Sequence, residues 1–381
     1  MSDLTYRVVV GLEIHVQLNT RTKMFCGCAL RFGEEANSRV CPVCLGLPGA
    51  LPVMNGQAVE HSILAAMALN CEIAEFTKWD RKSYYYPDLP KNYQISQYDL
   101  PLCYDGVLEV PAGNGEMRKV GIIRAHLEED AGKNIHERPG ITQVDLNRTG
   151  TPLLEIVTQP DLGSEEEAYS FCTELQRLVT YLGVSEGNMQ KGQMRFEPNV
   201  NVAIEHDGHE YRTPIVEVKN LNSFRAVRDA IAYEVQRQVG DWMADRDYVI
   251  GKAAKENRGW DDVRGITEYQ RSKEEAHDYR YFPDPDLVPV EVSDEWLDQI
   301  RESVGETPRE RSLRMQDRYS LTPADADTIL ADRATADLFE AAAQVGNAAT
   351  LGKQFISFWS MHANERITTI AGLGIEAARL G

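Results

Sequence analysis

Residues 8–18 read Val-Val-Val-Gly-Leu-Glu-Ile-His-Val-Gln-Leu, and this stretch decides the fold. Apolar residues recur at every second position from Val8 to Leu18, whereas Glu13, His15 and Gln17 fall between them. Side chains alternate between two faces along a β-strand, so the pattern predicts a strand with one apolar and one ionisable face. We therefore expect a sheet that packs on the core with one face and carries carboxylate and imidazole groups on the other.

Four further stretches, at 120–129, 152–157, 195–204 and 215–219, repeat this arrangement. A sheet with one face in water also alternates, so a merely solvated face is the plain alternative. Clustered carboxylates repel one another unless cations neutralise them, and Glu, His and Asn are ligands for magnesium-type ions, whereas Arg and Lys bind phosphate. The recurrence favours a concave sheet that holds metal and a phosphorylated substrate. The expected polar faces carry Arg124, His126 and Glu128, then Glu155, then Arg195, Glu197, Asn199 and Asn201, then Glu217 and Lys219.

Four of the seven cysteines form two close pairs, Cys26-Gly27-Cys28 and Cys41-Pro42-Val43-Cys44, with twelve residues between the pairs. Two pairs separated by a short loop can bring four thiolates to the corners of a tetrahedron, as a structural zinc site requires. The alternative is four free thiols packed near a turn. We favour zinc, in a closed site that folds the loop and does no chemistry.

The sequence changes in character near residue 290. Before it, short strand-like runs, turns and two long helical patterns alternate, whereas residues 291–381 show mostly helical periodicity. This predicts an α+β domain over 1–290 followed by an all-α helical domain over 291–381. One long helix should begin at a capping box, Ser164–Glu167, and end before Gly183, and another should begin after Ser223. The polar stretch 251–265 has no periodicity and is expected to be a surface loop.

Composition and missing motifs exclude several classes of protein. The formal net charge of −19 argues against binding nucleic acid mainly by bulk neutralisation of phosphates. The sequence has no membrane-spanning run and no signal peptide, so we expect a cytosolic (cytoplasmic) protein. It also lacks a Gly-x-x-x-x-Gly-Lys-[Ser/Thr] loop and a Gly/Ser-rich amidase nucleophile loop. If nitrogen chemistry takes place, another chain must make the ammonia.

Seven longer motifs closely resemble the B-type subunits of the aspartyl/glutamyl-tRNA amidotransferases. They are long, ordered and family-specific, and they cover the chain to about residue 290. The motifs are Gly11–Leu18, Asp80–Lys91, Tyr93–Gln97, His126–Lys133, Asp145–Arg148, Lys219–Phe224 and Asp278–Pro283.

The resemblance implies one chain of a heterotrimeric ligase used in protein biosynthesis. In such an enzyme an A-type amidase subunit releases ammonia from glutamine, and a small C-type subunit clamps the amidase to the B-type subunit. The B-type subunit uses ATP and magnesium to phosphorylate the side-chain carboxylate of Glu-tRNA(Gln) or Asp-tRNA(Asn), and ammonia then displaces the phosphate. Its fold resembles the glutamine-synthetase cradle, which would place a polar-faced sheet and a zinc-stapled loop in the first domain.

Site residues follow from the resemblance by position. Glu13 and His15 fall in the metal motif of the first strand, and Glu128 and Glu155 resemble the other magnesium carboxylates, so these four are the expected catalytic residues. Candidate contacts to ATP or a phosphoryl group are Lys133, Arg148 and Lys219. The zinc positions are Cys26, Cys28, Cys41 and Cys44.

Two departures from the family pattern stand out. Position 197 is Glu where many relatives carry Asp, which would move a metal held there outward by about one methylene. Relatives usually continue into a small tail domain that contacts tRNA, whereas this sequence stops at Gly381, so we expect a truncated or naturally short chain.

Three alternatives compete with this interpretation. The archaeal E-type subunit is disfavoured because the interval between Asn220 and Tyr279 is too short for its inserted domain. A non-catalytic zinc-containing scaffold that binds tRNA would have no reason to cluster ionised groups such as Glu13 and Glu128. A free-standing ammonia ligase acting on a small acid would need no amidase partner, and copurification would distinguish it.

Overall fold

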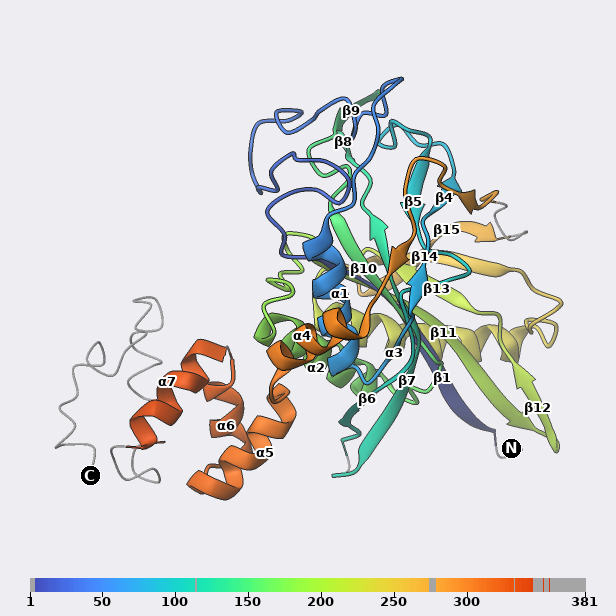
Figure 1. The fold of residues 1–381 in the computed structure, drawn as a ribbon. Helices are drawn as coiled ribbons and strands as arrows, with labels where there is room; N and C mark the ends of the chain where they lie inside the picture. Colours follow the sequence, from blue (N-terminus) through green and yellow to red (C-terminus); the bar gives the residue numbers. More distant parts are fainter. Residues whose placement is uncertain are drawn as a thin grey trace.

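One large sheet dominates the computed structural model, which describes residues 4–113, 115–273, 279–331 and 333–344, together with Gly352 and Ile356. Its ten strands are β1 (Thr5–Gln17), β2 (Glu72–Ile73), β6 (Cys103–Pro111), β7 (Met117–Glu129), β10 (Pro152–Thr158), β11 (Met194–His206), β12 (His209–Arg212), β13 (Val216–Lys219), β14 (Lys255–Asp261) and β15 (Ile266–Lys273). They lie in the order β15-β14-β13-β11-β1-β10-β7-β6-β2, with β12 paired to β11 (Figure 1). The strand predicted first in the sequence therefore lies at the centre of the sheet.

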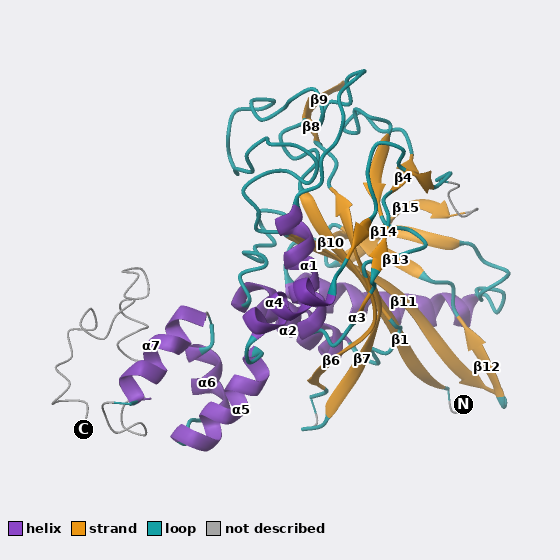
Figure 2. Ribbon diagram, in the orientation of Figure 1, coloured by secondary structure: helices purple, strands orange, loops and turns teal. Residues whose placement is uncertain are grey.

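The apolar face of the sheet is buried, as the alternation predicts. Val10, Leu12, Ile14 and Val16 of β1 are at most 1% exposed. Helices α2 (Glu165–Tyr181) and α3 (Phe224–Ala244) pack together on this face, whereas α1 (Gly56–Ala68) lies against β7 (Figure 2). Burial of these side chains contributes most to the stability of the fold, because each Å² of apolar surface removed from water stabilises it by about 25 cal/mol. The opposite face of the sheet is left for the polar side chains.

The first predicted helix is confirmed, but its capping differs from the prediction. The Ser164 side chain accepts a hydrogen bond from the Glu167 N–H, and Gly183 ends the helix with φ of +71°. The Glu167 carboxylate does not complete a capping box. It accepts from the Gly163 N–H at 2.8 Å and pairs with Arg118 at 3.1 Å, because that cation lies on the neighbouring β7.

The loop predicted over residues 251–265 is wrong, since the strand β14 occupies Lys255–Asp261. β14 pairs in parallel with β13 and in antiparallel with β15, so both edges of its backbone are hydrogen-bonded. Two of its positions have close neighbours that a sequence pattern does not reveal. Arg258 lies 3.3 Å from the buried Glu234 of α3, and Gly259 leaves room for Gln270, whose amide nitrogen would lie 2.4 Å from a Cβ at that position.

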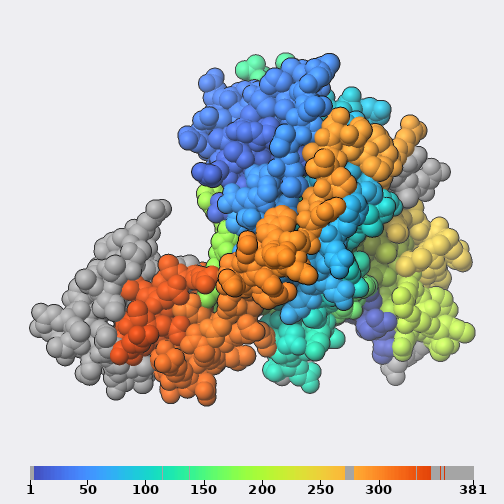
Figure 3. Space-filling view, in the orientation of Figure 1, coloured from blue at the N-terminus to red at the C-terminus, as the bar shows by residue number. Residues whose placement is uncertain are grey.

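Three small sheets surround the large one. β4 (Asp80–Ser83) lies between β5 (Tyr93–Ser96) and β16 (Phe282–Pro283), β3 (Phe76–Thr77) pairs with β17 (Val290–Glu291), and β8 (Lys133–Arg138) pairs with β9 (Ile141–Asp145). Through these pairings the chain after residue 279 returns to the first hundred residues. Figure 3 shows this segment, in orange, lying across the blue N-terminal part.

The second part of the described chain is helical, as predicted. Helices α4 (Asp294–Val304), α5 (Pro308–Tyr319), α6 (Pro323–Ile329) and α7 (Arg333–Ala343) follow β17. α4 packs on α1, whereas α5 is joined to α2 by a hydrogen bond of 2.8 Å from Arg311 to the Tyr181 hydroxyl. The predicted domain boundary at residue 290 falls in β17. Most of the predicted helical region beyond Gln344 lies outside the described residues.

Together these elements confirm the coarse prediction of a mixed α+β protein with a large sheet and C-terminal helices. Among the residues that the structure describes, no helix combines the length and the apolar character needed to cross a bilayer.

Candidate active site

A cavity of about 920 Å³ lies over the polar face of the sheet. Five strands of the large sheet contribute ionisable side chains to it: Glu13 and His15 from β1, Arg124, His126 and Glu128 from β7, Glu155 from β10, Arg195 and Glu197 from β11, and Glu217 and Lys219 from β13. Its other wall consists of residues 82–98 and 279–281. The predicted polar faces thus meet at one cavity, although Asn199 and Asn201, which were predicted to lie on the same face of β11, are absent from its lining within the described residues.

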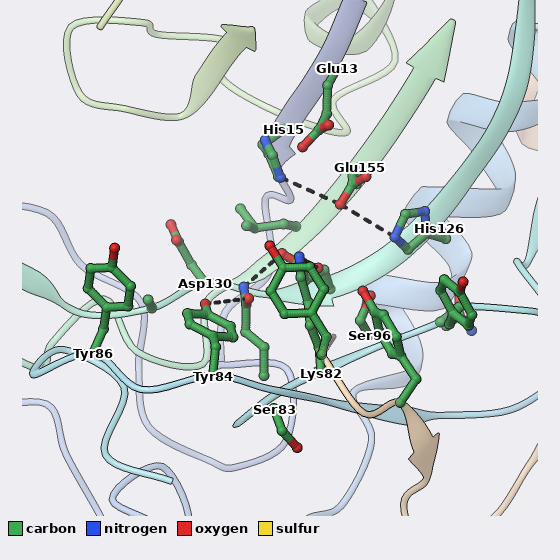
Figure 4. Close-up of a pocket in the computed structure, with 18 of the residues that line it drawn as sticks. Glu13, His15, Lys82, Ser83, Tyr84, Tyr86, Ser96, His126, Asp130 and Glu155 are labelled. Carbon is green, nitrogen blue, oxygen red and sulfur yellow. Dashed lines mark hydrogen bonds and ion pairs between the residues drawn. The ribbon is translucent and has the colours of Figure 1, made fainter. Parts of the chain in front are cut away.

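Glu155 lies between two histidines at the centre of this surface. The strand register makes His15, Glu155 and His126 neighbours in one row across β1, β10 and β7. The Glu155 carboxylate is 3.6 Å from His15 Nε2 and 3.5 Å from His126 Nε2, and Figure 4 shows it between the two rings. A one-residue slip of either strand pair would turn these side chains to the opposite face, so the register fixes the triad.

Charge interactions in this row determine which groups are ionised. Burial alone would raise the pKa of Glu155, but His126 and His15 outweigh it and hold the pKa well below the usual value. Burial alone would lower the pKa of His15, and contact with Glu155 raises it instead. Burial, followed by the charge of Glu155, raises the pKa of Glu13. Glu155 is therefore the fixed negative charge of the site at neutral pH.

Four other carboxylates of the cavity are paired with cations that also line it. Glu128 lies 3.4 Å from Lys82 Nζ and accepts a hydrogen bond of 2.7 Å from Gln94. Lys219 pairs with both Glu197 and Glu217. Burial alone would lower the pKa of Lys219, but the two carboxylates outweigh it and raise the pKa. Further along the wall, Asp130 binds Arg195 at 3.0 and 3.2 Å and Arg148 at 3.4 Å.

Two groups of three side chains have the geometry of a cation site. Glu13, His15 and Glu155 offer ligand atoms within 4.8 Å of one another, and so do His126, Glu128 and Glu155. The buried Nδ1 atoms of His15 and His126 have no hydrogen-bond partner among the described residues. Carboxylate oxygens with one or two imidazoles suit hard divalent ions, so these residues fit magnesium or manganese.

Comparison with known proteins agrees with this geometry. A sequence profile of the GatB/GatE catalytic domain matches residues 8–298, which is more than half of the chain.

The chain belongs to the GatB/GatE family.

Several relatives match the chain over most of its length, and each is the B subunit of an aspartyl/glutamyl-tRNA(Asn/Gln) amidotransferase. The relative from Rhodopirellula baltica is 52% identical over 383 residues, which cover 98% of this chain and 76% of the relative. The relative from Thermoanaerobacter sp. is 50% identical over 337 residues, with 88% and 69% covered. The relative from Geotalea daltonii is 50% identical over 343 residues, with 89% and 70% covered.

Most site residues predicted from the resemblance to this family lie in the cavity. Its lining includes Glu13, His15, Glu128, Glu155, Arg148 and Lys219. Lys133 is different, because it is an exposed residue of β8 and is absent from the lining within the described residues. Glu197, the departure from the family pattern, pairs with Lys219 and belongs to neither three-ligand group of the described chain.

The site residues taken from the family resemblance left out three side chains that line the cavity. His126 was visible on the polar face of its strand, and its spacing of two from Glu128 was the signal that could have identified it. Arg195 was visible in the same way on β11. Lys82 comes from β4, outside the large sheet, and only its place in the Asp80–Lys91 motif pointed to it.

The four paired cysteines also come together, in a separate cluster away from the cavity lining. The ligand sulfurs of Cys26, Cys28, Cys41 and Cys44 lie within 4.8 Å of one another. A hydrogen bond with Cys26 lowers the pKa of Cys44 to about 4, and the same bond raises the pKa of Cys26. Four sulfurs at this spacing, one of them readily ionised, fit a tetrahedral zinc site.

Lys23 connects the cysteine cluster to the cavity wall. Its side chain is fully buried, and its ammonium group lies 3.6 Å from Cys44 Sγ, 2.8 Å from the Arg39 carbonyl and 3.4 Å from the Leu146 carbonyl. Asn37 adds two hydrogen bonds of 3.0 Å, to Asp145 Oδ1 and to the carbonyl of Val144. The cysteine loop is therefore fastened to the segment that leads into Arg148.

Proposed function

We propose that this chain uses ATP to activate the side-chain carboxylate of Glu-tRNA(Gln), Asp-tRNA(Asn) or both, and that it then amidates that carboxylate with ammonia from a partner amidase. Membership of the GatB/GatE family and the names of the relatives support the class of reaction. The observation that carries the proposal for this chain is the triad of His15, Glu155 and His126, with Glu13 and Glu128 on either side of it.

The proposed chemistry needs positive charge between two anions, since a carboxylate must approach a triphosphate. Magnesium bound by Glu13, His15, Glu128 and Glu155 would supply that charge and polarise the phosphoryl group. Strand-borne side chains keep their positions between turnovers, which favours electrostatic stabilisation of the transferring group. His126 orients Glu155 in this arrangement, because the two lie 3.5 Å apart with the histidine buried.

The cations of the cavity would contact the phosphates. Arg124 is the strongest candidate, because it lines the cavity and makes no ion pair within the described residues. Lys219 and Arg148 can contribute after exchanging their present carboxylate partners for phosphate. Arg148 also donates to the carbonyls of Ala131 and Gly132, so it shapes the wall as well as carrying charge. Lys133 would need movement of β8 to reach the cavity, which makes it the weakest of the proposed contacts.

The partners follow from what the sequence lacks. It has no amidase nucleophile motif, so an A-type amidase subunit must supply ammonia, and a small C-type subunit would join that amidase to this chain. We further propose that residues 1–290 form a glutamine-synthetase-like cradle and residues 291–381 a helical domain. A structural zinc ion held by the four cysteines completes the proposed cofactors.

A reconstitution experiment tests the proposal. The chain, combined with the amidase and the small C-type subunit, should convert Glu-tRNA(Gln) or Asp-tRNA(Asn) to the amide with ATP, magnesium and glutamine, and ammonium should replace glutamine. The variant Glu128→Gln should lose activity by at least ~100-fold, as expected when a charge is removed from a preorganised site. Glu166→Gln, an exposed carboxylate of α2, is the matched control. Unchanged amidation by folded Glu128→Gln would favour a non-catalytic scaffold instead.

A further inference from the structure

The cavity wall formed by residues 82–98 and 279–281 carries a row of five tyrosine rings, each in contact with the next. In order they are Tyr86, Tyr84, Tyr279, Tyr281 and Tyr98, which we call the aromatic row. The first three contacts are edge-to-face with ring centroids 5.9–6.0 Å apart. In the last contact Tyr281 and Tyr98 are stacked, with centroids 4.0 Å apart and planes inclined by 8°. Segments nearly 200 residues apart in sequence therefore form one continuous aromatic surface.

The ends of the aromatic row face solvent although its middle is fixed. Tyr86 is 53% exposed and Tyr98 is 50% exposed, and the neighbouring Tyr85 is 80% exposed. In the middle, the Tyr84 hydroxyl donates a hydrogen bond of 2.5 Å to Gln94, and Lys82 Nζ lies 5.4 Å from the centre of the Tyr279 ring. Exposed aromatic rings gathered on a preformed surface usually mark a binding site.

The position of the row restricts what it can bind. All five tyrosines, and Tyr85, line the same cavity as the carboxylates. Figure 4 shows Tyr84 and Tyr86 across the cavity from Glu13 and His15. An amino acid that reaches the carboxylates while esterified to the terminal ribose of a tRNA must bring the last nucleotides to the cavity. The unpaired bases at that end have flat faces that stack on tyrosine.

The net charge of the chain strengthens this argument. At −19 the protein offers tRNA little general electrostatic attraction, so the acceptor end needs contacts of another kind. Stacking on aromatic rings supplies such contacts, and it tolerates any base because every base has a π-face. We propose that the unpaired 3′ end of the aminoacyl-tRNA docks on the aromatic row, with terminal bases stacked on Tyr86 and Tyr98. This inference rests on the proposed function, because it names where that substrate binds.

Steady-state kinetics of the reconstituted complex test the proposal. Tyr86→Ala and Tyr98→Ala should each raise the KM for the aminoacyl-tRNA by about 10-fold, the size of effect expected for losing one stacked base. The kcat and the KM for ATP should change less than about 2-fold, because neither variant touches the carboxylates. Tyr86→Phe should restore the wild-type KM, since phenylalanine keeps the ring.

The matched control is Tyr269→Ala. Tyr269 is 56% exposed, but it lies opposite Arg258 on the face of the sheet that α3 covers, away from the cavity. The Tyr269→Ala variant should leave the KM for tRNA unchanged. A rise in the KM for ATP alone, in the tyrosine variants, would assign the row to the adenine of ATP and overturn the proposal. Equal losses in Tyr86→Ala and Tyr269→Ala would also overturn it.

A binding measurement separates this inference from the proposed function. A tRNA with 2-aminopurine at its 3′-terminal position should lose fluorescence on binding the complex, because stacking quenches that base. The quenching should be weaker with Tyr86→Ala and Tyr98→Ala and unchanged with Tyr269→Ala. This readout needs no turnover. Quenching without amidation would support the docking site and contradict the proposed activity. Amidation by a complex that shows no quenching would contradict the docking site alone.

Discussion

The cysteine cluster and the histidine–carboxylate cluster are both groups of candidate metal ligands, but they are built in different ways. The four cysteines lie within nineteen consecutive residues, on loops with little regular secondary structure. Glu13, His15, His126, Glu128 and Glu155 come from three strands and are brought together by ladder register across the centre of the sheet. The first group is close in sequence, whereas the second is close only in the folded protein.

Charge is also balanced differently in the two clusters. One buried ammonium group, that of Lys23, lies against Cys44 in the cysteine cluster. In the cavity several carboxylates have cationic or imidazole neighbours: Glu155 has two histidines, Glu128 has Lys82, and Glu197 and Glu217 share Lys219. A loop cluster therefore depends on its ligand for its shape, while a strand cluster keeps its shape through the backbone ladders. Substitutions should separate these two behaviours.

The largest effect should come from removing the central charge of the cavity. Glu155→Gln keeps the size of the side chain, so the ladders and the fold should persist while the fixed negative charge between His15 and His126 is lost. We expect ATP-dependent amidation to fall by ~100-fold or more. Activity assays with circular dichroism check this. A variant that unfolds would contradict the idea that the strand cluster keeps its own shape.

The reverse pattern is expected in the cysteine cluster. Cys41→Ser should abolish zinc binding and lower the free energy of unfolding by about 3 kcal/mol, because loss of a structural metal is one of the few causes of large single-residue effects. Amidation at saturating ATP should change much less. Denaturant unfolding and elemental analysis measure both quantities, and Cys71→Ser, half-buried like Cys41 but outside the cluster, controls for loss of a thiol. Unaltered stability together with no zinc in the wild-type protein would show a cluster of free thiols.

A smaller effect should follow from neutralising the buried ammonium group. Lys23→Met keeps most of the side-chain volume but removes the contact with Cys44, so a chelator should extract zinc about 10-fold faster, in line with a lost hydrogen bond to a charged group. Lys119→Met, an exposed residue of β7, is the control. Equal extraction rates in both variants would assign Lys23 to loop packing alone.

The smallest effects concern the phosphate contacts. Arg124→Ala should raise the KM for ATP by about 5-fold, since one charge-assisted hydrogen bond to phosphate is lost. Lys133→Ala should change it by less than about 2-fold, because Lys133 is exposed on β8. The comparison uses initial rates at several ATP concentrations. A larger effect at Lys133 than at Arg124 would mean that β8 moves over the cavity during the reaction.

Prediction from the sequence was strongest where one residue pattern acts alone. Alternation along 8–18 was sufficient to predict β1 and the faces of Glu13 and His15, because apolar burial determines which way the strand turns. The spacing of the cysteines was likewise sufficient to predict their cluster, and Ser164 and Ser223 marked two helix starts correctly.

Prediction was weakest where a residue depends on a distant partner. β14 has no apolar alternation, so the sequence indicated a loop. Its Arg258 pairs with Glu234 of α3, and its Gly259 leaves room for Gln270 of β15, and neither neighbour is visible in a local pattern. Lys82 approaches Glu128 from a separate small sheet, which no local pattern can indicate. The capping-box hydrogen bond predicted for Glu167 was wrong, because its carboxylate pairs with Arg118, which lies beside it only in the folded chain.

The pairing of β4 with β16 determines when the cavity is completed during synthesis. Arg81 and Asp284 form an ion pair of 2.7 Å across 203 residues, and Tyr279 and Tyr281 enter the cavity wall just before β16. A nascent chain that has not yet emerged beyond residue 284 can form the central strands and the cysteine loop, but one wall of the cavity is still missing. The substrate site is therefore among the last regions of the catalytic domain to form as the protein leaves the ribosome, and a ribosome stalled earlier would hold a sheet with its ionisable face open to solvent.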